Sequence, residues 1–239
     1  KEKDNVVWVC HALTANSEFT DWWSGLVEGI FDPDQYFIIC VNMLGGCYGS
    51  TGPLTINPED GKPYFHGFPS LTNRDMVGSF ELLRKHLGIK GIHSLMGGSM
   101  GGQQALEWSI QSPELVANLI LVGTNAVHSP WGVAFNESQR MAIETDPTWQ
   151  ESIPEAGMNG MKAARAIALL SYRSYQGYHN TQKEDNDQVT DDFRASTYQQ
   201  YQGEKLHQRF SAYTYWYLSK TMDSHNVGRG RNGIAAALA

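Results

Sequence analysis

The sequence predicts an α/β fold in which a mostly parallel β-sheet is flanked by helices and carries a helical insertion. Short apolar runs alternate with amphipathic segments through the first half of the chain, as in a sheet built from strand–helix–strand units. From about residue 124 this strand signal stops, and long polar and aromatic segments continue to about residue 222. The second half therefore predicts helices added to the sheet.

Four apolar runs are the predicted strands, and they cover Val6–Cys10, 36–41, 92–96 and 119–122. Two segments between them have apolar residues at helical spacing. These predicted helices cover residues 76–87, where Gly88 is placed to end the helix, and 103–111, which ends before Pro113. No strand run follows residue 122, so we expect the sheet in this chain to be incomplete.

The segment after the fourth run predicts an all-helical lid. Residues 161–175 and 213–222 are helical by pattern, and 181–190 is a polar loop. We therefore divide the chain into a core (1–124), a helical lid (125–223) and a segment returning toward the core (224–239).

Composition restricts the possible partners and compartment. With 18 basic and 25 acidic side chains, the net charge of −7 argues against a nucleic-acid-binding face, so an anionic ligand needs a local pocket. No run approaches the ~20 apolar residues that span a bilayer, and no metal-ligand motif is present. Cys10 and Cys40 lie in apolar runs and Cys47 in a glycine-rich loop, which favours a reducing, cytoplasmic compartment.

One motif carries chemistry: Gly97-Gly98-Ser99-Met100-Gly101 follows the third apolar run and precedes a helix. This is the strand–turn–helix context of the nucleophile elbow of the α/β-hydrolase fold, which presents a serine oxygen above the start of a helix. The alternative is a glycine-rich turn with an incidental serine. The position between strand and helix favours Ser99 as the nucleophile.

Attack by a serine on a carbonyl creates an oxyanion that needs hydrogen-bond donors. We expect the backbone N–H of Met100 to be one donor and that of Leu13, in the loop after the first strand, to be the other. His11 is a possible base, but it precedes Ser99 at a strand end. A hydrogen-bonding role within the loop is therefore favoured for His11.

Five segments together resemble the homoserine O-acetyltransferase family, whose members have the α/β-hydrolase fold and act in methionine biosynthesis. In chain order they are HALTAN (11–16), NMLGGCYGSTGP (42–53), GGSMGGQQALEW (97–108), ARAIALLSYR (164–173) and MDSHNVGRGR (222–231). They extend over nearly the whole chain.

The resemblance implies that Ser99 attacks the thioester of acetyl-CoA and that the hydroxyl of L-homoserine then attacks the acetyl-enzyme. It also implies that Arg165 and Tyr172, in the first lid helix, hold the amino acid. Their spacing of seven residues places both on one helix face. Without the resemblance, Arg165 would be interpreted as a surface arginine and Tyr172 as a packing aromatic. Acetyl-CoA is expected as a co-substrate with no permanently bound cofactor, and the resemblance implies a homodimer formed through the lid helices.

In this fold the catalytic residues follow the order Ser, Asp or Glu, then His. The histidines after Ser99 all belong to the predicted lid or to its end: His128, His179, His207 and His225. We therefore assign neither the catalytic acid nor the catalytic histidine to any residue present. A fragment that lacks the first strands and the part with the acid and histidine explains this, and a degenerate homologue is the alternative. Either form has little catalytic power by itself.

Several alternatives remain open at this stage. A succinyl donor, serine as acceptor, or an esterase on the same fold each suits the elbow, and a natively truncated chain would be a non-catalytic binding module. Residues 228–231 (GRGR) are either a contact for CoA phosphates or a basic turn, and Cys47 is expected to be an ordinary loop residue.

Overall fold

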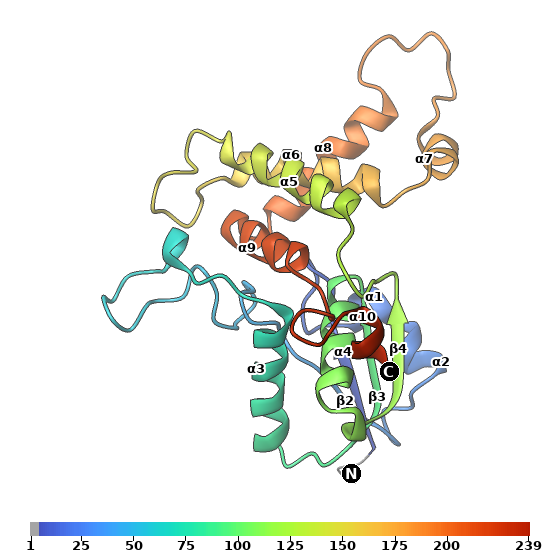
Figure 1. The fold of residues 1–239 in the computed structure, drawn as a ribbon. Coiled ribbons are helices and arrows are strands. Elements are labelled where there is room, and N and C mark those ends of the chain that lie inside the picture. Colours follow the sequence, from blue (N-terminus) through green and yellow to red (C-terminus); the bar gives the residue numbers. More distant parts are fainter. Residues whose placement is uncertain (1–4) are drawn as a thin grey trace.

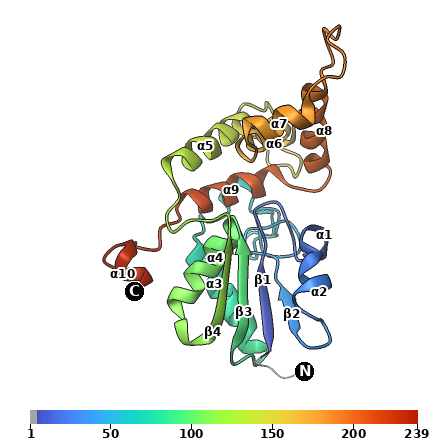
Figure 2. The same ribbon diagram turned by 90° about the vertical axis from the view of Figure 1, so that its right-hand side faces the viewer.

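The computed structural model describes residues 5–239, apart from the side chains of Val27 and Glu28. Its core is a parallel sheet with the strand order β2-β1-β3-β4 (Figure 2). The strands are β1 (Val6–Cys10), β2 (Phe37–Cys40), β3 (Ile92–Gly98) and β4 (Val116–Val122). The predicted α/β fold is confirmed, and β3 and β4 are both longer than their apolar runs.

Both faces of the central strands are buried, which explains their uninterrupted apolar sequences. On one face Trp8 packs edge-on against Trp108, with ring centroids 4.9 Å apart, and both belong to the main core cluster. On the opposite face Val7 and Val9 pack with Phe31 and Met96. The first face is covered by α3 (Asn73–His86) and α4 (Met100–Gln111). The short helices α1 (Thr20–Trp23) and α2 (Gly25–Gly29) lie at the other face.

Local capping fixes the ends of α3. Thr72 and Asp75 form a reciprocal capping box at its N-terminus, and Gly88, with φ of +66°, follows its last turn. The sequence pattern places the helix one turn too late, because the apolar spacing begins only at Met76. Short 3₁₀ helices cover Phe65–Gly67 and Pro113–Leu115.

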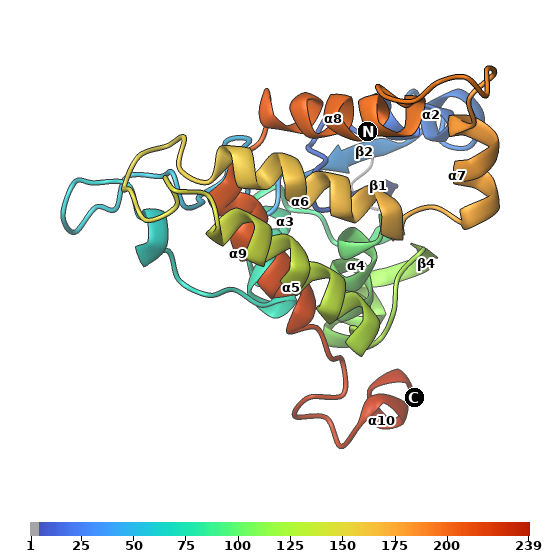
Figure 3. The ribbon, with the colours of Figure 1, turned by 90° about the horizontal axis from the view of Figure 1, so that it is seen from above.

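Five helices lie above the ends of the strands from which Ser99 emerges, and we call them the lid (Figures 1 and 2). They are α5 (Pro130–Glu144), α6 (Met158–Ser171), α7 (Tyr175–Gln182), α8 (Arg194–His207) and α9 (Ala212–Asp223). Seen from above, α5 crosses α9 while α6 runs beside α5 and toward α7 (Figure 3). The chain ends with α10 (Ile234–Leu238).

The lid has more helices than the sequence pattern predicts. The predicted helix 161–175 is wrong at its C-terminal end, because α6 stops at Ser171 and α7 begins at Tyr175, where the Ser174 side chain accepts from the N–H of Gly177. The pattern misses α5, although Ser129 and Pro130 are a start signal. It misses α8 because the exposed positions of that helix are almost entirely polar.

Candidate active site

The Ser99 turn has the geometry of a nucleophile elbow. Ser99 joins β3 directly to α4 with φ of +51° and ψ of −121°, a backbone conformation that non-glycine residues seldom adopt, and its side chain is exposed. A Cβ at Gly97 would lie 2.2 Å from the carbonyl oxygen of Gly101, and one at Gly101 would lie 2.0 Å from that of Cys10. Glycine is therefore required at both positions.

The same close approach places the loop after β1 against the elbow. A methyl group added at Gly101 would also come within 2.8 Å of the His11 carbonyl oxygen, so residues 10 and 11 lie directly beside the first turn of α4. In the described part of the chain, the N–H groups of Leu13 and Met100 have no hydrogen-bond partner. Free N–H groups beside an exposed serine are what an oxyanion-binding site requires.

His11 supports this loop. Its Nδ1 lies 2.9 Å from the carbonyl oxygen of Ala12, and its Nε2 accepts from the N–H of Met43 at 3.2 Å. An accepting Nε2 requires the proton to be on Nδ1, so both ring nitrogens are occupied. Burial lowers the pKa of His11, although the bond to Ala12 opposes this shift. His11 therefore fixes the loop as a neutral imidazole.

A second support comes from Arg209, which follows α8 and is absent from the residues that the sequence singled out. Its Nη1 donates to the carbonyl oxygen of Thr14 at 2.6 Å and to the hydroxyl of Tyr48 at 2.7 Å. Arg209 thus holds the peptide between Thr14 and Ala15, close to Leu13 in the same loop. A pattern of local residues gives no signal for it, because the partners are 195 positions apart.

Buried amides connect the elbow helix to the ends of the lid. Asn73 Nδ2 donates to Gln103 Oε1 at 3.2 Å and lies 3.1 Å from His225 Nδ1. Gln103 Nε2 donates to Asn125 Oδ1 at 3.1 Å, while His225 Nε2 lies 3.0 Å from the carbonyl oxygen of Asn125. The two connections between core and lid, near residues 125 and 225, are therefore joined on helix α4.

The lid carries its own half of this network. Arg140 donates to Asp223 at 2.6 Å and to Ser219 at 3.0 Å, and Asn136 donates to Asp223 at 2.8 Å. His128 Nε2 lies 3.2 Å from Asn136 Nδ2. Burial lowers the pKa of His128 and of His225, against smaller opposing contributions from Asp223 and from the Asn125 hydrogen bond respectively.

The four histidines after Ser99 lie in other surroundings. His128 and His225 belong to the buried network, His179 lies on α7 and His207 ends α8. Across residues 5–239, no histidine is hydrogen-bonded to the Ser99 hydroxyl. No group of three or more metal-ligating side chains occurs among these residues, and none of their helices is both long and apolar enough to cross a bilayer.

Arg165 and Tyr172 lie together, although not as two positions of the first lid helix. Arg165 is half-buried on α6, the second lid helix, and Tyr172 is the residue that follows that helix. The guanidinium carbon of Arg165 is 5.9 Å from the ring centroid of Tyr172. The turn at the end of α6 keeps helical backbone angles, so the predicted spacing still brings the two side chains together.

The GRGR turn is held by a buried carboxylate. Arg231 Nη1 donates to Glu107 at 3.0 Å, Arg74 donates to the same carboxylate at 3.1 Å, and Arg229 donates to the carbonyl oxygen of Ser224 at 2.7 Å. Burial raises the pKa of Glu107, but the hydrogen bonds from Arg231 and Gln111 outweigh burial and leave the pKa below its usual value. Arg231 is thus a structural ion-pair partner.

Burial raises the pKa of the Cys47 thiol, so Cys47 is not activated.

Comparisons with known proteins identify the fold and the family. A family model described as alpha/beta hydrolase fold matches residues 5–223. A homoserine O-acetyltransferase of Cyclobacterium marinum is 52% identical over 99% of this chain and 68% of that protein. The chain belongs to the homoserine O-acetyltransferase family. Members of this family transfer the acetyl group of acetyl-CoA to homoserine.

Two solved structures are similar throughout the chain. The homoserine O-acetyltransferase of Bacillus anthracis has a TM-score of 0.88 at 25% identity, covering 100% of this chain and 71% of that one. Esterase E22 has a TM-score of 0.84 at 22% identity, covering 98% of this chain and 72% of that one, a likeness that shows the fold alone. This homoserine O-acetyltransferase family chain spans roughly two thirds of the length of such relatives.

Proposed function

We propose that this chain carries the acyl-accepting half of a homoserine O-acetyltransferase, with Ser99 as the nucleophile. The observation that carries the proposal is an exposed serine at a strained strand–helix turn that packs against the start of the loop after β1. Among the described residues, the N–H of Met100, next to this serine, and that of Leu13, in the loop, have no hydrogen-bond partner. Ser99 Oγ attacks the thioester carbonyl of acetyl-CoA, and the N–H groups of Leu13 and Met100 stabilise the oxyanion. CoA leaves as the thiol, and the acetyl group stays on Ser99.

The second half-reaction transfers this acetyl group to the side-chain hydroxyl of L-homoserine. Arg165 supports binding of the amino acid, because a guanidinium group can hold a carboxylate with two parallel hydrogen bonds. Tyr172 lies against that guanidinium group and adds a hydroxyl to the same site. The lid helices lie above the junction of β3 and α4 (Figure 2), and we infer that in the complete enzyme they reduce access of water, which would otherwise hydrolyse the acyl-enzyme.

The histidine base and its acid are proposed to lie outside these 239 residues. The described histidines that are close to the elbow in the fold, His11, His128 and His225, are bound in structural networks. The relatives are longer than this chain, which covers 68% of the Cyclobacterium protein, and both catalytic residues are proposed to lie in the uncovered part.

A homodimer and a cytoplasmic location are further parts of this proposal. Trp131 and Met141, on the lid helix α5, are 73% and 57% exposed, which suits contact with a second lid. Cys10, Cys40 and Cys47 are all free thiols, as expected in a reducing compartment.

The test is an acetyl-transfer assay on the full-length protein. Release of free thiol from acetyl-CoA should require L-homoserine, and mass spectrometry without the acceptor should find one acetyl group on the Ser99 peptide. Equal thiol release without acceptor would indicate an esterase instead. The same assay with succinyl-CoA or L-serine identifies the preferred donor and acceptor.

Replacement of Ser99 tests directly whether this residue carries the acetyl group. Ser99→Ala should abolish the acetyl adduct and lower kcat by about 10⁴-fold or more, because no other group forms the acyl-enzyme. Ser94→Ala, at a buried serine on β3, the strand that leads to Ser99, is the control that keeps the adduct. An adduct that persists in Ser99→Ala would remove Ser99 from this role.

A further inference from the structure

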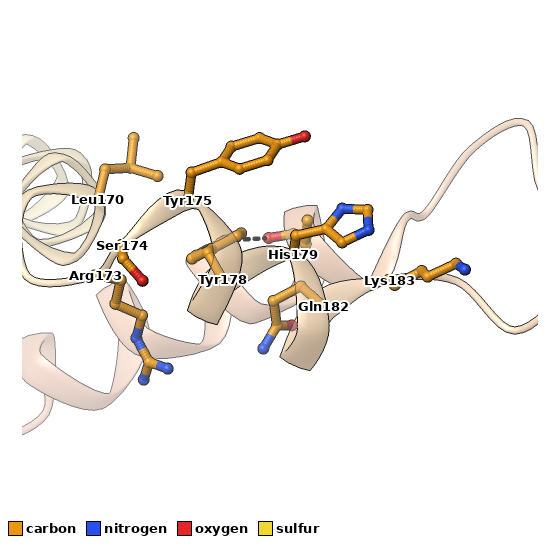
Figure 4. Close-up of a pocket in the computed structure, with 9 residues that line it drawn as sticks. Leu170, Arg173, Ser174, Tyr175, Tyr178, His179, Gln182 and Lys183 are labelled. Carbon is orange, nitrogen blue, oxygen red and sulfur yellow. Dashed lines mark hydrogen bonds between the residues drawn. The ribbon is translucent and has the colours of Figure 1, made fainter.

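The lid contains a pocket between the end of α6, helix α7 and the start of α8 (Figure 4). Its volume is about 450 Å³, in the range of small-molecule sites. Its surface is mostly apolar and carries two basic and three aromatic side chains, and the mechanism proposed for Ser99 does not use it. The side chains that matter for its chemistry are Arg173, Tyr175, Tyr178, His179 and Lys183.

The charge of this pocket is opposite to that of the whole chain. Arg173 and Lys183 line it and no Asp or Glu does, whereas the chain has a net charge of −7. Figure 4 shows the guanidinium group of Arg173 and the ammonium group of Lys183 at opposite ends of the row of lining residues, with Tyr175 and His179 between them. The pocket is therefore suited to a ligand with two separated anionic groups.

Arg173 is held in place for such a ligand. Its Nη2 donates to the hydroxyl of Tyr198 at 2.6 Å, and its guanidinium carbon is 5.4 Å from the centroid of that ring. Within residues 5–239 its other guanidinium N–H groups make no hydrogen bond. An arginine fixed by stacking, with N–H groups still free, loses little conformational entropy when it binds a phosphate.

Two aromatic side chains of α7 lie along the row of residues from Arg173 to Lys183 (Figure 4). Tyr175 and His179 stack with ring centroids 5.9 Å apart and an interplanar angle of 18°. Tyr175 is 83% exposed, so part of its ring remains open to a ligand. Exposed tyrosine rings bind nucleobases by stacking, with little dependence on the base.

We propose that this lid pocket binds the nucleotide end of the CoA thioester that donates the acyl group. CoA has phosphate groups at two places, the pyrophosphate and the 3′-phosphate, and a flat adenine, which match Arg173, Lys183 and Tyr175. The inference rests on the proposed acetyltransferase function. It is consistent with the chain path, because Arg173 directly follows Tyr172, which is proposed to contact the acceptor.

The test compares two acyl donors on the full-length protein: acetyl-CoA, and S-acetylpantetheine, which has no nucleotide. Arg173→Gln and Lys183→Gln should each raise the KM for acetyl-CoA about tenfold, because each removes a charged contact to a phosphate. The KM for S-acetylpantetheine and kcat should stay unchanged. Lys205→Gln, which removes the same charge from an exposed position of α8 outside the pocket, should alter neither KM.

An equal rise in KM for both donors, or no rise in the KM for acetyl-CoA, would contradict CoA binding in this pocket. The proposed acetyltransferase function would not be affected by either result. Failure of the unmodified protein to use either donor would overturn both. A second measurement does not depend on Arg173: adenosine 3′,5′-bisphosphate should compete with acetyl-CoA, and Lys183→Gln, an exposed substitution, should weaken that competition about fivefold or more. Inhibition that is not competitive would exclude the nucleotide from this pocket.

Discussion

At the scale of single residues, the backbone around Ser99 is packed so closely that there is no space for a side chain at Gly97 or Gly101. Gly97 and Gly101 face one another across the elbow, and Gly101 also faces the carbonyl groups at the end of β1. The backbone of Ser99 is strained, and strain of this kind costs about 1–3 kcal/mol that the packing around it must offset. The elbow is therefore sensitive to any added atom.

Gly101→Ala tests this packing. The new methyl carbon would lie 2.0 Å from the Cys10 carbonyl oxygen, so the loop or the helix must move. We expect the free energy of unfolding in denaturant to fall by about 2–4 kcal/mol. Gly78→Ala is the matched control, because that glycine is exposed within α3 and has no neighbour within 4 Å. It should raise stability by about 0.5–1 kcal/mol. Equal effects of the two substitutions would contradict the geometry.

Arg209 supports the loop after β1, so its replacement should lower kcat rather than change substrate binding. Arg209→Gln removes the donor that holds the Thr14 carbonyl, so the Leu13 N–H is less well fixed. We expect kcat to fall about tenfold with a small change in the KM for homoserine, because oxyanion stabilisation acts in the transition state. Arg194→Gln, an exposed arginine paired with Asp185, is the control. A loss confined to KM would assign Arg209 to substrate binding.

At the scale of elements, the lid is joined to the core through buried histidines rather than through apolar contact alone. His225 and His128 lie beside the two connections, and His11 lies under the loop after β1. Burial lowers the pKa of each of them from the ordinary value of 6.5. The three imidazoles are therefore kept neutral by the fold.

This arrangement predicts a loss of stability in mild acid. Below pH about 6.5 these histidines are protonated in the unfolded chain but not yet in the folded one, so the unfolded state binds more protons. The free energy of unfolding should therefore fall as the pH is lowered from about 7 to 5. Denaturant titrations at several pH values measure this slope. His225→Gln should reduce it, and an unchanged slope in that variant would show that His225 does not contribute.

At the scale of the whole molecule, the sheet ends in β4, an apolar strand that pairs with β3 on one side and with no strand of the described residues on the other. Four consecutive residues of β4, Leu119 to Val122, are 36–51% exposed. Next to them an apolar cavity of about 470 Å³ lies between β4 and the α1–α2 segment, with Trp22, Met96 and Ile120 in its lining. Strands of parallel sheets are normally covered on both faces, and an exposed apolar edge favours association.

The 239-residue chain should therefore self-associate through β4 when it is expressed by itself. Ile120→Lys should shift the sedimentation coefficient toward the monomer, because the charge opposes pairing of edges. Leu82→Lys, at a leucine 72% exposed on α3, is the control and should leave association unchanged. If the two variants sediment alike, β4 is not the contact.

The sequence by itself determined the parts of this protein that depend on neighbouring residues. The apolar runs predicted the four strands, and the two central strands, β1 and β3, are buried on both faces. The glycines around Ser99 predicted the elbow, because a turn that tight excludes side chains. The seven-residue spacing predicted that Arg165 and Tyr172 lie together, and the five segments predicted the family.

Only the tertiary structure decided which distant residues meet. The sequence pattern misses helix α8 because the helix has too few apolar residues to show regular helical spacing. The helical spacing of 161–175 continues through Ser174, although the structure has a break between α6 and α7 there. The bond from Arg209 to Thr14, the network around His225 and the charged pocket on α7 each join segments that local patterns treat separately. The physical reason is that helix and strand preferences and the burial of a face follow from residues that are near one another in the sequence. Long-range hydrogen bonds and pockets depend instead on how whole helices and strands pack.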